Sequence, residues 1–343
     1  MKSRSCVILA AGDGKRMVSE KPKVLMEVLF VPMLGWVIDA ARAAGIADEN
    51  IAVIIGNNAE AVSSYLASRG KFASFVQKDR LGTGHAVMQA EDFIRQKGGD
   101  VLVLCGDAPF MDKDTIDNAY QFHTENALGV TDITAEISNP ANYGRIKRGE
   151  GGKLKAIVER KDCTAEELLI NEVNSGAYWF EADALLSALP QIGNKNASGE
   201  YYLTDAVELI GERAGAFKSS DAKIVLGANN RKELRVLNRA MCETVNDRHY
   251  EAGVDIIGEN VLIGKDVVIG QDTTIMPNTI IRGETVIGKG CVIGPCSQID
   301  DCRIGCGAVL NNVYAANAVI MDGESFGPFV KVERSTLPVP GRQ

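Results

Sequence analysis

The sequence predicts two architectures in one chain: an α/β domain, in which helices cover a sheet, and a parallel β-helix after it. Strand-like and helix-like segments alternate from Cys6 to about Leu226, which is the pattern of a sheet covered by helices. Beyond Gly253, isoleucine recurs every six residues, and a fixed period of this kind indicates a repeat architecture. The expected divisions are an α/β domain over residues 1–229, a linker helix over 230–253, a β-helix over 254–333 and a C-terminal tail over 334–343.

The elements of the α/β domain follow from hydrophobic spacing and turn residues. A helix over residues 33–44 is predicted because Trp36, Val37 and Ala40 have helical spacing and Gly45 would end it. The other helices are expected over 59–68, 86–95, 182–189, 202–214 and 231–250, and the strands over 7–10, 51–55, 73–76, 101–104, 132–137, 144–147, 154–159, 176–180 and 223–226.

The β-helix is predicted from isoleucines at strict six-residue spacing, which fits one short strand and one turn per repeat. They are Ile257, Ile263, Ile269, Ile275, Ile281, Ile287, Ile293 and Ile299. After Ile299 the spacing slips, and the repeat is recovered only loosely through Ile304, Leu310 and residues 319–332. The tail, with Pro338 and Pro340, is predicted to be extended.

The composition argues against nucleic acids and membranes as binding partners of this protein. The 343 residues are enough for two domains, and the net charge of −8 without a Lys/Arg run argues against a nucleic-acid surface. No apolar run approaches the roughly 18 residues that a membrane helix needs. The basic start, residues 1–4, leads directly into the first strand without an apolar signal segment, so we expect a cytoplasmic protein with no membrane partner.

The cysteines raise the possibility of a zinc site. Four of the eight fall within sixteen residues, at positions 291, 296, 302 and 306. No pair has C-x-x-C spacing and no histidine follows His249, so small buried thiols in a reducing compartment are the favoured interpretation.

A glycine-rich and cationic loop follows the first strand. Its sequence is L-A-A-G-D-G-K-R-M over residues 9–17, and K-P-K over residues 21–23 closes it. Gly12 and Gly14 allow backbone N–H groups to approach a polyanion closely, while Arg16 and Lys23 supply charge. A dinucleotide fingerprint would need a glycine where Met17 stands, and a Walker loop is absent. A tight strand-to-helix turn would use the same glycines, so this loop alone leaves two interpretations open.

A candidate metal ligand follows the most apolar strand of the domain. The strand over 101–104 ends in Cys105-Gly106-Asp107, which places the Asp107 carboxylate just past its C-terminal end. In open α/β sheets ligands bind at that edge. Asp107 would suit Mg²⁺, a hard ion satisfied by few protein oxygens together with phosphates and waters, although an aspartate there could instead cap a helix.

Taken together, these motifs resemble those of the N-acetylglucosamine-1-phosphate uridylyltransferases. The signature loop matches, with Ala11 pointing to the N-acetylglucosamine branch, and the resemblance continues in order into the β-helix. The further motifs are Gln77 with L-G-T-G-H-A over 81–86, G-D over 106–107, N-Y-G-R-I over 142–146, I-V-E-x-K-D over 157–162, E-V-N-x-G over 172–176, G-E-Y-Y-L-T-D over 199–205 and A-N-N-R over 228–231.

The resemblance implies a Rossmann-like nucleotidyltransferase domain with a mostly parallel mixed sheet, followed by a short left-handed parallel β-helix. It also implies Mg²⁺-dependent uridylyl transfer from UTP to N-acetylglucosamine-1-phosphate. A sugar 1-phosphate has a second pKa of about 6 and is already a nucleophile at neutral pH, so cations and backbone donors, and no general base, are required.

Roles are expected for the following residues. Arg16 and Lys23 would stabilise the α-phosphate and the departing pyrophosphate, unless either is only an exposed cation in a surface pair. Asp107 would hold Mg²⁺, and the resemblance adds Asn229 as its second protein ligand. The resemblance assigns nucleotide binding to Leu9, Ala11, Gly12, Gly14, Gln77, Gly82 and Thr83, and sugar-phosphate binding to Gly144, Glu159 and Asn174. Since the reaction needs neither acid nor base, His85 is expected to be structural.

The chain departs from the resemblance at several points. Family members commonly carry a second site in the β-helix that transfers acetyl from acetyl-CoA and uses a histidine, but His85, His123 and His249 all lie outside residues 254–333. We therefore expect no acetyltransferase activity. Phe30-Val31-Pro32 replaces a usual Gly-Lys-Pro turn, and Asn57-Asn58 a glycine-histidine pair.

Alternatives to this function remain open. The first keeps the class and changes the sugar, for instance to glucose-1-phosphate. The second, from another class, is a catalytically silent nucleotide sensor or scaffold that uses the β-helix to oligomerise. The resemblance implies a homotrimer through the β-helix.

Overall fold

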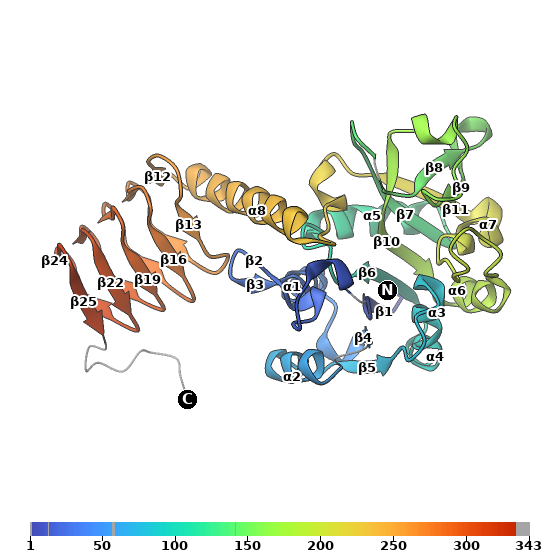
Figure 1. The fold of residues 1–343 in the computed structure, drawn as a ribbon, viewed down its shortest axis with the longest axis horizontal. Helices are drawn as coiled ribbons and strands as arrows, with labels where there is room; N and C mark the ends of the chain where they lie inside the picture. The colour runs from blue at the N-terminus through green and yellow to red at the C-terminus, as the bar shows by residue number, and fades with distance from the viewer. Residues whose placement is uncertain (1, 13, 57–58, 141, 334–343) are drawn as a thin grey trace. The chain divides into compact units, whose positions relative to one another are not determined.

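The computed structural model describes residues 2–12, 14–56, 59–140 and 142–333 (Figure 1). The predicted tail and the Asn57-Asn58 departure lie outside these residues. Contacts divide the chain into two compact units, Met1–Glu27 with Val31–Leu234, and Val28–Phe30 with Arg235–Gln343. The predicted domain ranges stay a prediction, and each unit is described by itself below.

A mostly parallel sheet with one long antiparallel strand forms the centre of the first unit. Its strand order is β11-β7-β10-β6-β1-β4-β5, with β8 and β9 attached beside β10. Only β10 runs antiparallel to its neighbours β6 and β7 along that path. The strands are β1 (Arg4–Ala10), β4 (Ile51–Ile55), β5 (Ala73–Val76), β6 (Asp100–Cys105), β7 (Val130–Glu136), β8 (Arg145–Arg148), β9 (Leu154–Val158), β10 (Glu172–Glu181) and β11 (Ala214–Lys218). The predicted fold class is confirmed.

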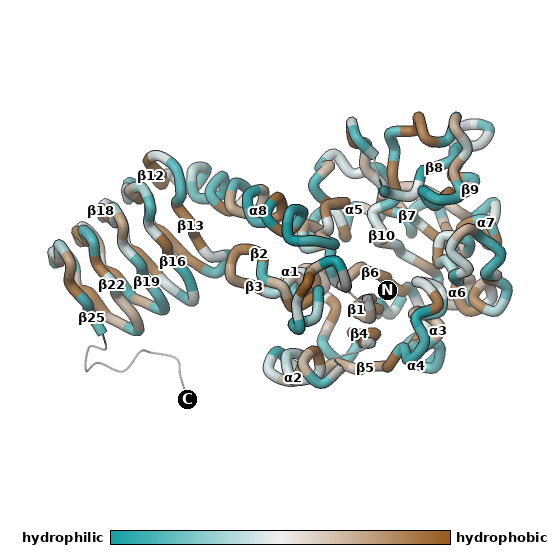
Figure 2. Tube along the Cα trace, viewed as in Figure 1, coloured by the Kyte–Doolittle hydropathy of each residue, from teal (hydrophilic) through white to brown (hydrophobic). Residues whose placement is uncertain are grey.

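Helices cover both faces of this sheet, because alternate side chains of each strand point to opposite faces. On β1, Ile8 packs with helices α1, α2 and α5, whereas Val7 packs with α3, α4, α6 and α7. The helices are α1 (Met33–Ala43), α2 (Ala59–Arg69), α3 (Thr83–Met88), α4 (Glu91–Lys97), α5 (Lys113–Glu125), α6 (Ala182–Ala188) and α7 (Asp205–Ile210). The buried strands β1, β4 and β6 are correspondingly among the brown, hydrophobic segments in Figure 2.

Three predicted elements were wrong: one helix is divided in two, one helix is too long, and one strand is a 3₁₀ helix. The helix expected over 86–95 is two helices, α3 and α4, which meet at Gln89 and Ala90. The helix expected over 202–214 ends at Ile210, because Gly211 has a positive φ of 66° and stops it. The strand expected over 223–226 is a 3₁₀ helix, η8 (Ala222–Val225); the strand that extends the sheet edge is β11.

Strand β10 is longer than the predicted 176–180 and contains a β-bulge. Its register against β7 shifts between Asn174 and Ala177. Ser175 donates its hydroxyl to the Ile133 carbonyl (2.6 Å), and Gly176 has a φ of 78°. A bulge re-aims the side chains around it, here at the strand end that carries Asn174.

The second unit is the predicted β-helix, built from short parallel strands in three stacked sheets (Figure 1). One sheet has the order β12-β15-β18-β21-β24, the second β13-β16-β19-β22-β25 and the third β14-β17-β20-β23. The strands are β12 (Asp255–Ile256), β13 (Leu262–Ile263), β14 (Val268–Ile269), β15 (Thr274–Ile275), β16 (Ile280–Arg282), β17 (Val286–Ile287), β18 (Val292–Ile293), β19 (Gln298–Asp300), β20 (Arg303–Ile304), β21 (Val309–Leu310), β22 (Val313–Ala316), β23 (Val319–Ile320), β24 (Ser325–Phe326) and β25 (Val330–Glu333).

The isoleucines of the repeat fill the interior, with one exception. Those from Ile263 to Ile299 are buried, and brown segments recur along the coils in Figure 2. Ile257 was wrongly placed in this set. It is 48% exposed, and its neighbour Ile256 is buried and pairs with Ile275.

The slip in the repeat shortens the coils. In the third sheet the step between register partners is 18 residues from Val268 to Val286, 17 from Val286 to Arg303 and 16 from Arg303 to Val319. The strand side chains nevertheless still alternate between the interior and the outside of the β-helix, because the shorter coils lose residues from their turns and not from their strands.

Early residues 28–30 belong to this second unit. The Leu29 N–H donates to Asn238 Oδ1 (2.9 Å) on α8 (Arg231–Glu251), and Arg282 lies over the Phe30 ring at 5.7 Å. The departure at Phe30 therefore changes residues that pack with the β-helix unit.

All eight cysteines are free thiols, but the expectation that they are buried is wrong for two of them. Cys296 and Cys306 are exposed, because each lies in a turn of the β-helix. Across residues 2–333, in the segments described, no group of three or more His, Cys, Asp or Glu side chains could hold a metal. The same segments contain no helix long and apolar enough to cross a membrane.

Candidate functional site

A cavity of about 480 Å³ opens at the C-terminal ends of β1 and β6. Eight of the predicted site residues line it, together with Val24, Arg80, Ala86, Cys105 and Glu200. The eight are Leu9, Ala11, Gly12, Lys23, Gln77, Gly82, Thr83 and Asp107. These residues come from segments that are distant in the sequence, and parallel strands bring them together because their carboxyl ends meet at one edge of the sheet.

The glycine loop wraps around the stem of Lys23. Gly14 has a φ of 58°, and a Cβ on it would lie 2.7 Å from the Cβ of Lys23, so only glycine fits there. The Gly14 carbonyl accepts from the N–H of Met17 (2.8 Å), whose side chain is buried and anchors the 3₁₀ turn η1 (Lys15–Met17). Arg16, on the same turn, is exposed and lies outside the lining of the cavity.

Lys23 joins the two predicted metal ligands. Its ammonium group donates to Asp107 Oδ2 and to Asn229 Oδ1, the latter at 3.1 Å. The side chains of Lys23 and Asp107 are 12% and 23% exposed. A carboxylate oxygen and an amide oxygen thus converge on one cation, which is the donor set that suits a hard ion such as Mg²⁺.

The capping alternative for Asp107 does not hold. Helix α5 begins at Lys113 and is capped by Asp112, whose carboxylate accepts from the Thr115 N–H at 2.7 Å. The Asp107 carboxylate contacts Lys23 instead.

Asn229 is positioned by the start of helix α8. Asn230 caps this helix by accepting from the backbone N–H groups of Lys232 (2.9 Å) and Glu233 (3.0 Å). Glu233 in turn accepts from the Asn229 N–H (2.7 Å) and from the Asn230 side chain (2.6 Å). This reciprocal cap fixes the backbone of Asn229, and with it the direction of its amide.

The predicted nucleotide-base end lies beside Gln77, which is buried. Its amide donates to the Gly82 carbonyl (3.0 Å) and contacts His85 Nδ1 (3.1 Å). Gly82 has a φ of 107°, and a Cβ there would lie 2.5 Å from the Tyr201 carbonyl oxygen. His85 thus holds the amide of Gln77, which agrees with a structural role.

The three predicted sugar-phosphate residues cluster next to this cavity without lining it. The Asn174 N–H donates to the Gly144 carbonyl (3.0 Å), and a Cβ on Gly144 would lie 3.7 Å from Glu159 Oε2. Glu159 accepts from the Thr204 hydroxyl (3.3 Å), and burial raises the pKa of its carboxyl group. Cys105 lines the cavity and also contacts Gly176, two residues beyond Asn174, so the two groups adjoin.

Sequence reasoning missed four polar or reactive residues at the site: Arg80, Cys105, Glu200 and Tyr178. The first three line the cavity. They also lie within or next to the motifs quoted above, and this position in the sequence could have identified them as site residues. Tyr178 contacts Asn174 only because of the bulge in β10, and no motif marks it.

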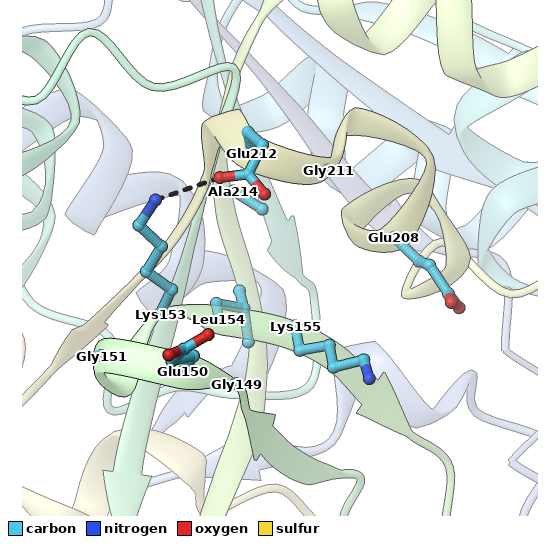
Figure 3. Close-up of a pocket in the computed structure, with 10 residues that line it drawn as sticks. All are labelled: Gly149, Glu150, Gly151, Lys153, Leu154, Lys155, Glu208, Gly211, Glu212 and Ala214. Carbon is cyan, nitrogen blue, oxygen red and sulfur yellow. Dashed lines mark hydrogen bonds and ion pairs between the residues drawn. The ribbon is translucent and has the colours of Figure 1, made fainter.

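A second cavity, of about 620 Å³, lies beside the β8–β9 hairpin (Figure 3). Its lining comprises Gly149, Glu150, Gly151, Lys153, Leu154, Lys155, Glu208, Gly211, Glu212 and Ala214. Lys153 reaches across to Glu212 (3.0 Å), and both side chains are largely exposed. Solvated charges of both signs do not define a ligand, and no predicted site residue lies there, so the first cavity is the candidate site.

Asp132 is an unusual buried group near the site. It lies on β7 opposite Tyr178 and is fully buried, and neither oxygen of its carboxyl group has a hydrogen-bond partner among the residues that the structure describes. Burial raises the pKa of its carboxyl group well above the ordinary value, and the charge of Glu172 adds to the shift. The folded state thus keeps a proton that the unfolded state releases, so the free energy of unfolding falls as pH rises from about 4 toward the folded pKa.

Replacing Asp132 with asparagine removes this ionisation. We expect Asp132→Asn to raise the melting temperature by about 3–8 °C at pH 8 and to change it little at pH 4. Differential scanning calorimetry at both pH values tests this, with Asp114→Asn as the control because the Asp114 side chain is 90% exposed. Equal shifts at the two pH values would show that ionisation of Asp132 does not limit stability.

Comparison with known proteins agrees with this geometry. A model of the nucleotidyl transferase family matches residues 5–223, and a model of bacterial transferase hexapeptide repeats matches residues 266–300. A Bacillus anthracis structure described as a glucose-1-phosphate thymidylyltransferase shares the fold, with a TM-score of 0.58, 21% identity and coverage of 69% of this chain and 95% of that one. The fold and the site therefore define a nucleotidyltransferase followed by hexapeptide repeats.

Relatives identify the branch. The bifunctional protein GlmU of Halalkalibacterium halodurans is 40% identical over 341 residues, which are 98% of this chain and 74% of that protein. GlmU of Clostridium botulinum is 40% identical over 334 residues, 96% of this chain and 72% of that protein. The chain belongs to the GlmU family, and the resemblance to uridylyltransferases seen in its motifs is confirmed.

Proposed function

We propose that this enzyme transfers the uridylyl group of UTP to N-acetylglucosamine-1-phosphate, with Mg²⁺ as cofactor, and releases pyrophosphate. The observation that supports this most directly is the convergence of Lys23, Asp107 and Asn229 beside a glycine loop. One organic cation and two hard-ion ligands beside a glycine loop are the groups that a triphosphate bound with Mg²⁺ would require.

The chain's own residues would act by positioning and by charge. A phosphate oxygen of the sugar 1-phosphate attacks the α-phosphorus of UTP, and the bond between the α-phosphorus and the bridging oxygen breaks. Lys23 and the N–H groups of the glycine loop offset the charge on the reacting phosphates and on pyrophosphate. Asp107 and Asn229 would hold Mg²⁺, which supplies further neutralisation of phosphate charge when bound. Gln77 and Gly82 would contact uracil.

Arg16 would act together with Lys23, although its side chain is exposed. Its turn η1 follows the glycine loop directly, so a bound triphosphate would lie within reach of a long side chain on this turn. The role of Arg16 remains a prediction from its place in the motif.

The sugar cluster favours an acetamido sugar. Asn174 provides an amide, and Glu159 a buried carboxyl group, beside the backbone of Gly144. We expect kcat/KM for N-acetylglucosamine-1-phosphate to exceed that for glucose-1-phosphate by at least tenfold, measured by pyrophosphate release from UTP. A tenfold preference for glucose-1-phosphate would reverse the choice of substrate. Tight UTP binding without pyrophosphate release would support a nucleotide-binding scaffold instead.

We expect uridylyl transfer without acetyl transfer. Residues 254–333 contain no histidine, the residue that the related acetyltransferases use. Incubation with acetyl-CoA and glucosamine-1-phosphate should therefore release no free coenzyme A thiol above a blank.

We also propose that the enzyme is cytoplasmic and that its β-helix forms a homotrimer. Sedimentation equilibrium tests the oligomeric state.

A further inference from the structure

The amide of Asn174 is held in one orientation by two hydrogen bonds. Its Oδ1 accepts from the Gly176 backbone N–H (2.7 Å), and its Nδ2 donates to the Tyr178 hydroxyl (2.5 Å). An amide oxygen has two lone pairs and an amide nitrogen two N–H groups, so one acceptor site and one donor remain for a ligand. The rotation of the amide by 180° would break both bonds.

The backbone around Asn174 is fixed independently. Ser175 bonds to the Ile133 carbonyl of the neighbouring strand, and the Asn174 N–H bonds to Gly144 (3.0 Å). A Cβ on Gly176 would lie 2.7 Å from Cys105 Sγ, so the bulge packs tightly against the end of β6. The side-chain torsions are therefore the main freedom left to Asn174.

Tyr178 is well placed to restrict that freedom. It is 3% exposed, its ring centroid is 5.6 Å from that of Phe180, and it lies opposite buried Asp132 in the sheet register. A buried and packed ring cannot swing its hydroxyl away, and the hydroxyl has little access to water. The hydroxyl is thus a rigid anchor for the Asn174 amide.

We propose that Tyr178 is a positioning residue, which holds the Asn174 amide so that its free N–H faces the carbonyl oxygen of the sugar's acetamide group. This inference rests on the proposed function and extends it to the selection between sugars. The acetamide is a trans amide, whose carbonyl and N–H point in opposite directions, so one side-chain amide can bond to its carbonyl oxygen but not to both groups. The oxygen of a hydroxyl at the same carbon lies two bonds closer to the sugar ring than the acetamide oxygen does, so it cannot reach that N–H.

Tyr178→Phe removes only the hydroxyl and tests this role. We expect the KM for N-acetylglucosamine-1-phosphate to rise about tenfold and the preference for it over glucose-1-phosphate to fall about tenfold. The kcat and the KM for UTP should stay within about twofold. Tyr120→Phe is the matched control, because it removes the hydroxyl of a half-buried tyrosine that is bonded to Asp100 (3.1 Å) at the N-terminal end of β6, the end opposite to the site.

A double-mutant cycle shows whether Tyr178 affects the sugar preference through Asn174. In an Asn174→Ala background, Tyr178→Phe should change the sugar preference by less than twofold, because the group that it positions is already absent. An unchanged preference in the single variant, or an equal loss in both backgrounds, would overturn the proposal.

A readout that does not depend on activity separates this proposal from the proposed function. In the two-dimensional nitrogen–proton spectrum of the wild-type protein, we expect the Asn174 side-chain amide, assigned by its loss in Asn174→Ala, to exchange slowly with water and to move in Tyr178→Phe. A rapidly exchanging amide would overturn the positioning role. If the amide is ordered but the wild-type protein uses glucose-1-phosphate better, the proposed substrate and the acetamide part of the inference fail, and the contact itself stands.

Discussion

Lys23→Ala is expected to lower kcat by about 10²–10³, the usual loss when one well-placed stabilising group is removed from a charged transition state. The ammonium group is mostly buried and points at the predicted metal ligands, so neither water nor a neighbouring side chain replaces its charge. The KM for UTP should change less than kcat, because the loss is greatest when charge moves to pyrophosphate.

Lys21→Ala provides the matched control for Lys23. Lys21 lies two residues earlier in the same segment, but its side chain is 45% exposed and pairs with Glu27 (3.0 Å). We expect its kcat to stay within about twofold. Stopped assays of pyrophosphate at saturating UTP make the comparison, and an unchanged kcat in Lys23→Ala would remove this residue from the mechanism.

Asp107→Ala should have a comparable or larger effect, and it should remove the response to metal. The Asp107 carboxylate is the only charged oxygen that contacts Lys23 among the described residues, and its loss leaves Asn229 as the sole predicted protein ligand for Mg²⁺. We expect turnover to fall by about 10³ and to depend no longer on Mg²⁺ between about 0.1 and 10 mM, roughly the range over which weak hard-ion sites fill.

The metal site can also be tested without turnover. Binding of Mn²⁺, followed by electron paramagnetic resonance in the presence of UTP, should weaken strongly in Asp107→Ala and by about 10–100-fold in Asn229→Ala. Asp114→Ala, at an exposed position on α5, should bind Mn²⁺ as the parent does. If Asp107→Ala binds Mn²⁺ as tightly as the parent, the ligand lies elsewhere.

Much of the arrangement of Lys23, Asp107 and Asn229 could be predicted from the sequence. Asp107 was placed by a strong local signal, a short apolar strand that ends in Gly-Asp, and the structure puts it at the expected sheet edge. Lys23 and Asn229 lie 84 and 206 residues from their partners, so only the ordered set of motifs indicated that they share a site.

What the sequence left undetermined depends on tertiary contacts. Strand β11 has the sequence A-G-A-F-K, whose β-propensity is weak, and it is a strand because β7 offers it a sheet edge. The contact between Tyr178 and Asn174 exists only after a bulge changes the strand register, and alternation along a strand cannot show such a shift. Cys296 and Cys306 were misplaced because residue type alone does not distinguish a turn position from an inward one.

The shortening coils of the β-helix make its repeats non-interchangeable. Excision of one full turn from the early part, where partners are 18 residues apart, would rejoin strands with the inward-facing isoleucines still inside. The same length cut from the later part, where the step is 16, would overshoot by two residues and bring turn residues into the layer that Ala315 and Ile320 now fill. Loop grafts, fusions or truncations in this unit must therefore respect the local step of each turn.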